Sequence, residues 1–240
     1  MEVYRGVHAI RVLTNKKGFT LQGLIDAAFD SYMPSFDELL PPLFRDFDAA
    51  PDSPAKQKVA EAVGILKAWD KRWAIPSVAT SVATFYADEV RTKQDRKLEA
   101  LATAMDTLQS NFGNWKTPWG DINRFQRISS EIVHPFDDAK PSIPVAFSSA
   151  RFGSLASFGA APRNGTKKWY GTSGNSFVAV IEFGDQVKAK AVTAGGLNSV
   201  PGSKHFNDQA ERYATGNLRD VYFYRDQLKG HTEREYKPGQ

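Results

Sequence analysis

The spacing of apolar residues changes partway along the chain, and this change constrains the fold more than any other feature of the sequence. In residues 1–133 apolar side chains recur every three or four positions, which is the period of an amphipathic helix. Residues 177–183 are instead rich in β-branched and aromatic residues, and residues 187–192 alternate apolar with polar side chains, as strands do. Helices followed by antiparallel strands predict a fold of the α+β class.

Capping residues mark the starts and ends of the predicted helices. Thr20 is suited to cap one helix, and Ser53 followed by Pro54 is typical of the start of another. Gly113 is suited to end a helix, whereas Pro41-Pro42 is expected to interrupt the segment that contains it. The predicted helices comprise residues 20–28, 36–43, 54–69, 77–90 and 97–108.

The second part of the chain is predicted to contain a β-hairpin. Its first strand, residues 177–183, is a continuous apolar run and is therefore expected to be buried on both faces. Gly184-Asp185 supplies the turn, and residues 187–192 form a half-exposed second strand. Weaker strands are expected at 145–147 and 168–170, and short helices at 207–214 and 225–229.

One domain with two segments is expected from this order. Residues 1–133 form a mostly helical segment, and residues 134–240 form a β-hairpin and short-helix segment of the same domain. The stretch from His134 to Pro144 holds three Pro and three charged residues, and we interpret it as the connection.

Composition and charge exclude several classes of function. Lys and Arg number 31 and Asp and Glu 27, giving a net charge of +4, and the basic residues are interleaved with acidic ones. Nucleic-acid binding needs a basic stripe or patch, so we expect no nucleic-acid partner. The absence of Cys excludes disulfides, thiolate metal sites and a Cys nucleophile. No window approaches 18 consecutive apolar residues, so no membrane association is expected.

The first residues of the chain do not decide in which cellular compartment the protein lies. They lack the basic and then apolar layout of a signal peptide. Cysteine absence is compatible with both periplasm and cytosol. The chain is therefore cytosolic, has lost a signal, or is a piece of something longer.

Generic catalytic motifs are absent from the sequence. There is no phosphate-binding loop, dinucleotide fingerprint or His-x-x-x-His pair. Gly171–Asn175 begins like a nucleophile elbow, but its last Gly is replaced and a strand follows where the elbow needs a helix. Among the four histidines, His205 has the densest polar surroundings, with Asp208 three positions on. The simpler interpretation is a structural loop in which Asn207 or Asp208 caps a helix.

A second dense cluster combines Trp119, Gly120, Asp121 and Arg124. Asp121 and Arg124 are three positions apart, close enough to pair on a helix. The cluster contains no nucleophile and no base that titrates near neutral pH. We therefore predict a structural, at least partly buried Asp121–Arg124 pair at the boundary between the helical and strand parts.

Taken in order, these clusters resemble motifs of the penicillin amidase (penicillin acylase) family. Residues 119–124 resemble its Trp-Gly-Asp…Arg motif, and residues 174–183 resemble the strand that follows. Gly195-Gly196 and residues 201–209 resemble its Gly-Gly…Ser-Pro-His-Tyr-x-Asp-Gln stretch, which places His205, Asp208 and Gln209 in a shared structural motif.

The resemblance covers most of the chain. The ordered motifs run from about residue 117 to the end and include the closing tail, residues 234–239. The helices that begin near Arg5 are also similar to the helical segment of the family. One departure is Lys204, which stands where Pro is common.

The resemblance implies an amidohydrolase with an N-terminal nucleophile and an αββα sandwich fold, of which this chain would be the C-terminal portion of the β chain. Such a precursor cleaves itself and exposes a Ser, Cys or Thr whose α-amino group serves as base. A backbone N–H and an Asn side chain stabilise the oxyanion. The chain begins with Met1 and its match begins inside the β chain, so the nucleophile and the oxyanion Asn are expected outside it.

The resemblance also implies partners and a location. The partners would be the α chain, the N-terminal part of the β chain and a small-molecule amide substrate, in a periplasmic or secreted enzyme without cofactor or metal. Arg5 is the candidate substrate-binding residue, because family members carry an Arg shortly after the oxyanion Asn. The fragment alone is expected to be inactive, and a sheet edge or apolar face near the hairpin should lie open.

Two other functions fit the same sequence. One is a non-catalytic binding or scaffold domain that keeps this half of the fold. The other is a stand-alone enzyme that uses His205 and Asp208.

Overall fold

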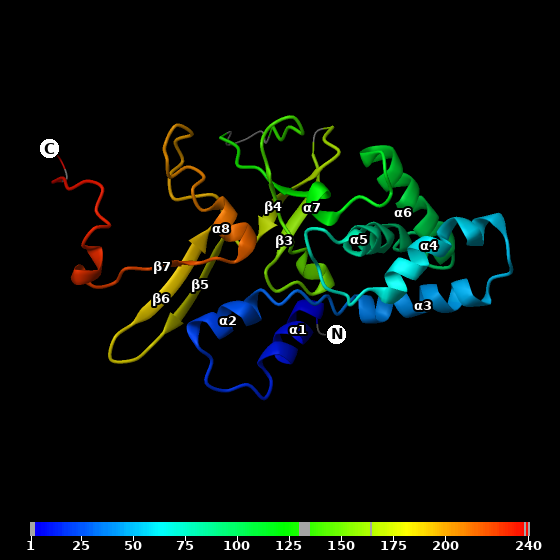
Figure 1. Ribbon diagram of the computed structural model, residues 1–240, viewed down its shortest axis with the longest axis horizontal. Coiled ribbons are helices and arrows are strands. Elements are labelled where there is room, and N and C mark those ends of the chain that lie inside the picture. Colours follow the sequence, from blue (N-terminus) through cyan, green and yellow to red (C-terminus); the bar gives the residue numbers. More distant parts are fainter. Residues whose placement is uncertain (1–2, 130–134, 164, 238, 240) are drawn as a thin grey trace.

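Helices fill the first half of the chain. The computed structural model describes residues 3–129, 135–163, 165–237 and 239. The helices of this half are α1 (Tyr4–Leu13), α2 (Leu21–Ala28), α3 (Phe36–Ala49), α4 (Pro54–Ala68), α5 (Val78–Val90), α6 (Lys97–Phe112) and the single turn α7 (Trp119–Ile122). Helices α3 to α6 lie together at one end of the molecule, shown on the right in Figure 1.

The predicted helix ends are confirmed where they depend on local contacts. Thr20 accepts a hydrogen bond from the Gly23 amide at 3.0 Å, and Ser53 accepts one from the Lys56 amide at 3.2 Å. Gly113 ends α6 with a φ of 76°, in the left-handed region that glycine adopts without strain.

The expected interruption at Pro41-Pro42 is wrong, because α3 continues through both prolines. Each proline removes one backbone donor from the helix. Packing offsets this loss: Phe36, Leu40 and Leu43 on the inner face of α3 have no exposed surface, and α3 packs against α4 and α6. Helix α5 is enclosed most completely, and its side chains form the centre of the helical core.

Two small sheets follow the helices. The first contains β1 (Asn123–Phe125), β2 (Ile143–Pro144), β3 (Phe158–Pro162) and β4 (Trp169–Gly174) in the order β2-β1-β4-β3. Only β1 and β4 are parallel among these neighbours. The second contains β5 (Phe177–Glu182), β6 (Lys188–Thr193) and β7 (Arg219–Asp220), all antiparallel. The remaining elements are the 3₁₀ turns η1 (Ala150–Phe152) and η2 (Arg225–Leu228) and helix α8 (Ala210–Thr215).

Most predicted strands and short helices are found, with shifted ends. The strand expected at 168–170 lies in β4, whereas 145–147 is not a strand, although Val145 and Phe147 are buried. Helix α8 starts three residues later than expected, and the expected helix at 225–229 is a 3₁₀ turn. His134, in the predicted connection, lies outside the described residues, and the division at 133/134 stays a prediction.

The predicted hairpin is antiparallel, but the expected burial of its first strand is wrong. Val180 of β5 is 6% exposed and faces the second core, whereas Phe177 and Ile181 on the other face are 61% and 48% exposed. Phe183, just after the strand, is 82% exposed. Strand β5 is also an edge of its sheet. An apolar face and an open edge therefore lie beside the hairpin, as a half-fold would require.

A second core lies between the two sheets, α2 and α8. Val180, Val192 and Phe158 contribute from the strands, Ile25 from α2 and Tyr213 from α8. Phe147 lies among the aromatic rings of this core and is 1% exposed. Its ring meets those of Phe29, Trp73, Phe158 and Tyr213 at centroid distances from 5.3 to 6.1 Å.

We predict that Phe147→Ala lowers the free energy of unfolding by about 3–5 kcal/mol, because it leaves a cavity among packed rings. The matched control is Phe183→Ala, which removes an exposed ring and should change that free energy by less than about 0.5 kcal/mol. Urea unfolding followed by circular dichroism measures both. Equal effects of the two substitutions would contradict the assignment of the second core.

Candidate functional site

The predicted substrate-binding residue, Arg5, lies on the first turn of α1 and is exposed. Its Nη2 donates to the Leu155 carbonyl at 2.8 Å and to Asn175 Oδ1 at 3.3 Å. Asn175 Oδ1 also accepts the Ser157 amide at 2.8 Å, which fixes the orientation of its side chain. The guanidinium is thus held where β4 ends and β5 begins, next to the junction of the two sheets.

A hollow of about 320 Å³ opens at the same junction. Its polar wall is the segment 172–176, which includes Asn175, and its apolar wall includes Phe125, Phe158 and Tyr213. Sequence reasoning missed Asn175, because the only signal was a glycine-rich turn that fails as a nucleophile elbow. Arg5 and this hollow share Asn175 as a common neighbour.

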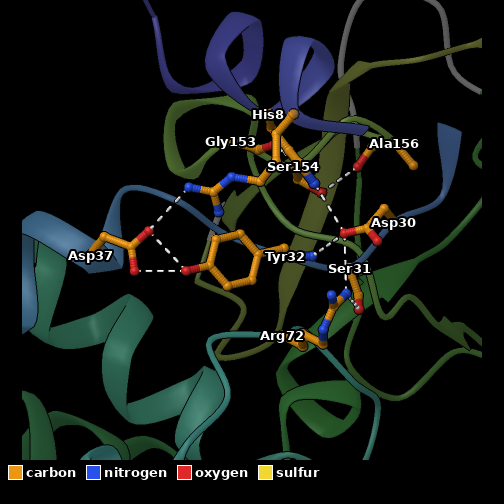
Figure 2. A network of polar contacts seen from close by, with 10 residues as sticks. His8, Asp30, Ser31, Tyr32, Asp37, Arg72, Gly153, Ser154 and Ala156 are labelled. Carbon is orange, nitrogen blue, oxygen red and sulfur yellow. Dashed lines mark hydrogen bonds and ion pairs between the residues drawn. The ribbon is translucent and has the colours of Figure 1, made fainter. Parts of the chain in front are cut away.

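Helix α1 is anchored by a network of polar contacts (Figure 2). His8, which has no exposed surface, lies within hydrogen-bond distance of the Gly153 carbonyl through Nδ1, at 2.7 Å. Its Nε2 lies 3.0 Å from Asp30 Oδ1. Spacing along the chain does not reveal this role of His8, because Asp30 is 22 residues away and Gly153 is 145 residues away.

Asp30 collects several donors on one oxygen. The Tyr32 amide donates to Oδ1 at 2.9 Å and Arg72 Nη1 at 3.1 Å, in addition to the contact with His8. Burial alone would raise the pKa of Asp30, but the Tyr32 amide, the Arg72 guanidinium and His8 together hold that pKa below its ordinary value. Asp30 is therefore a carboxylate at neutral pH.

Tyr32 extends this network to α3. Its hydroxyl donates to Asp37, whose Oδ1 also accepts Lys71 Nζ at 2.6 Å. Burial would raise the pKa of Asp37, but Lys71, Tyr32 and Arg11 lower it. The Tyr32 ring lies 4.7 Å from the Arg11 guanidinium carbon, a cation–π contact. These contacts tie α1 and α3 to the turn that carries Lys71.

The ion pair predicted within the cluster at residues 119–124 is not formed, and the structural role of the cluster stays a prediction. Trp119 is buried and donates Nε1 to the Ala146 carbonyl at 3.0 Å. Asp121 is exposed, and no ion pair in the described part of the chain includes it. Arg124 Nη1 donates to the Gly120 carbonyl at 2.8 Å, and Nε donates to Ser142 Oγ at 3.0 Å.

The reason for the missing pair is the length of α7. This helix ends at Ile122, so Arg124 belongs to strand β1, and a spacing of three residues no longer places two side chains on one helix face. Burial lowers the pKa of Arg124, and the charge of Asp121 opposes this shift. The charge of Asp121 thus affects Arg124 without direct contact, while the backbone carbonyls of Gly120 and Ser142 accept hydrogen bonds from the guanidinium.

His205 joins two segments through carboxylates. Its Nδ1 lies 2.7 Å from Asp208 and its Nε2 lies 2.9 Å from Glu233. Asp208 first and Glu233 second raise the pKa of His205. With both ring nitrogens on carboxylates, His205 has no nitrogen left to activate a hydroxyl, which argues against the stand-alone enzyme. Glu233 also pairs with Lys204.

Gln209 and the paired glycines hold the loop that carries His205. Gln209 is buried, its amide donates to the Gly195 carbonyl at 2.7 Å, and its Oε1 accepts the Thr193 amide at 3.1 Å. Neither Asn207 nor Asp208 caps α8 with its side chain, so that part of the expectation is wrong. A Cβ at Gly196 would lie 2.2 Å from the His205 carbonyl oxygen, so the backbone needs glycine there.

The described residues contain neither a candidate metal site nor a helix that could span a membrane. No group of three or more His, Asp or Glu side chains there could hold a metal ion. None of the described helices is long and apolar enough to cross a membrane.

The helical first half and the two small sheets define a mixed α+β fold. The family model for penicillin amidase matches residues 1–230, and the chain belongs to that family. Among solved structures it is similar to a thermostable penicillin G acylase from Alcaligenes faecalis, with a TM-score of 0.51 and 11% sequence identity. That match covers 97% of this chain and 52% of the acylase chain, so this chain spans about half of its length.

We predict that Arg124→Met lowers the free energy of unfolding by about 1–3 kcal/mol, because the Gly120 carbonyl and Ser142 lose a charged donor. Asp121→Ala, in the same cluster, should change it by less than about 0.5 kcal/mol because Asp121 is exposed. Thermal unfolding of both variants is the measurement. A larger loss for Asp121→Ala than for Arg124→Met would restore the predicted ion pair.

A second prediction concerns the two glycines of the His205 loop. Gly196→Ala should cost about 1–3 kcal/mol of stability, because the new methyl group meets backbone oxygens that cannot move aside alone. Gly202→Ala has no atom within 4 Å of the added Cβ and should cost less than about 0.5 kcal/mol. Chemical denaturation compares the two, and a neutral Gly196→Ala would show that the loop can shift freely.

Proposed function

We propose that this chain is part of an amidohydrolase that cleaves an acyl-amide bond with an N-terminal nucleophile located outside the chain. The observation that carries the proposal is the match to the penicillin amidase family over residues 1–230. The coverage of 52% of the Alcaligenes faecalis acylase chain supports a division in which other polypeptide supplies the remaining elements.

In this proposal the reaction is acyl transfer to the external nucleophile and then to water. The free α-amino group of that nucleophilic residue takes the proton from the side chain of the same residue. An α-amino group suits this role as base because its pKa is about 7.7–8.0. The activated side chain attacks the amide carbon, and a backbone N–H with an Asn side chain stabilises the oxyanion. The amine leaves with a proton, and water then releases the acid. The family uses no cofactor for these steps.

Arg5 is the residue of this chain that we assign to the substrate. It presents an exposed guanidinium beside the hollow whose polar wall contains Asn175. A guanidinium offers several N–H donors in a plane, which suits a carboxylate or carbonyl on a small amide substrate. Leu155 and Asn175 restrain its orientation, so little side-chain entropy is lost on binding.

The partner surface in this proposal is the open face of β5. Phe177, Ile181 and Phe183 are exposed on it, and the strand has a free edge. Exposed apolar residues beside an unpaired strand edge favour covering by another polypeptide. We assign this face to the remainder of the acylase, meaning its α chain and the N-terminal part of its β chain, and we place the enzyme in the periplasm or outside the cell.

The experiment compares the 240-residue chain alone with the chain produced together with the reading frame upstream of Met1. A chromogenic phenylacetyl or acyl anilide should be hydrolysed only by the second preparation, because the nucleophile is supplied there. Hydrolysis by the pure chain alone would contradict the proposal. A complex without activity on any acyl anilide would favour the binding or scaffold domain.

In the active preparation, Arg5→Ala should lower kcat/KM by about 10- to 100-fold through the loss of a charged hydrogen bond. Lys16→Ala, an exposed cation just beyond the other end of α1, serves as the control and should leave kcat/KM unchanged. Equal values for Arg5→Ala and the unaltered enzyme would remove Arg5 from the substrate site.

A further inference from the structure

His8 faces only acceptors, and this fixes its protons. The Gly153 carbonyl at Nδ1 can accept but cannot donate, so Nδ1 carries a hydrogen. Nε2 faces Asp30 Oδ1, which already receives donors from the Tyr32 amide and Arg72. An oxygen that already accepts these two donors has no room for a proton of its own. The shared proton therefore resides on Nε2, and the buried ring is an imidazolium.

The surrounding charges support that state. Asp30 is the direct partner of His8, and Arg72 Nη1 lies 3.1 Å from the same Asp30 oxygen. The centroid of the Tyr32 ring lies 6.1 Å from that of the imidazole. Arg11 stacks on Tyr32 and lies 3.7 Å from Asp37, which also pairs with Lys71. Arg11 and Lys71 therefore share Asp37, whereas Asp30 is shared by His8 and Arg72.

His8 is the most deeply buried side chain of helix α1. His8 is its one buried residue in the described structure, whereas Val3, before the helix, and Ile10 and Leu13 on it are 73%, 55% and 46% exposed. An ordinary amphipathic helix docks by burying an apolar stripe. On helix α1 the apolar side chains of Val7 and Val12 are only half buried. Directional polar contacts therefore help to set the position of the helix.

The same loop receives both His8 and Arg5. His8 binds the carbonyl of Gly153, and Arg5, one turn earlier on α1, binds the carbonyl of Leu155. Gly153 has a φ of 98°, and a Cβ there would lie 2.4 Å from Pro34, so the loop is packed closely against the start of α3. Movement of α1 would shift Arg5 relative to Asn175.

We propose that His8, as a buried imidazolium, is a positioning residue that sets the place of Arg5 in the substrate site. This inference rests on the function proposed above for Arg5. The charge of His8 and the effect of His8 on α1 can nevertheless be measured without any substrate.

The first experiment reads the ring nitrogens of the ¹⁵N-labelled 240-residue chain at pH 7 by NMR, with His8→Gln identifying the His8 signals. Both nitrogens should carry protons, and Asp30→Asn should return one of them to the unprotonated form. If His8→Gln does not fold, replacing the other three histidines by Gln leaves the His8 ring as the one that gives signals. An unprotonated nitrogen in the unaltered chain would overturn the proposal.

The second experiment measures amide hydrogen exchange in α1. His8→Gln should speed exchange across residues 4–13, while the control His231→Gln, an exposed ring stacked on Tyr222, should not. Unchanged exchange in His8→Gln would show that α1 is held by other contacts, and would overturn the positioning role.

The third experiment tests whether His8 acts through Arg5. In the active enzyme, His8→Gln should lower kcat/KM by about tenfold, yet cause no further loss when Arg5→Ala is already present. A loss of equal size in both backgrounds would overturn the positioning role while leaving Arg5 as a substrate residue. No effect of Arg5→Ala would overturn the function of Arg5 and the positioning role together, and the NMR result would still decide the charge of His8.

Discussion

The ring of Trp169 is the contact on which the two parts of the molecule depend. It stacks on Phe85 of α5 with a centroid distance of 4.8 Å and meets Trp119 of α7 edge to face at 6.0 Å. Trp169 belongs to β4, which lies beside β1 and β3 in the first sheet. The helical core and the first sheet therefore share one aromatic junction.

Sequence reasoning was reliable where structure depends on neighbours along the chain. The caps at Thr20 and Ser53 and the turn at Gly113 are decided within four residues, and all were found. Strand β5 was expected to be buried on both faces, but its outer face is exposed. An apolar run in the sequence is the same whether or not another segment covers that face. The Asp121–Arg124 pair failed for a related reason, since its spacing has meaning only in a helix longer than α7.

The candidate site was predictable only in part. Arg5 could be singled out through the family resemblance, but its partners Leu155 and Asn175 lie 150 and 170 residues away. The roles of His8 and Asp30 had no sequence signal, because a contact between residues far apart in the chain is recognised by the groups around it rather than by spacing. Distant contacts of this kind are set by the tertiary fold alone.

The open edge of β5 has a consequence for how such a chain is made. An unpaired strand with an apolar face is a template for a second copy of itself, so the free chain is prone to form aggregates in proportion to its concentration. Synthesis within one precursor, as the family resemblance implies, would raise the effective concentration of the correct neighbour above that of any other chain. Self-cleavage after folding would then preserve an assembly that separate polypeptides reach only in competition with aggregation.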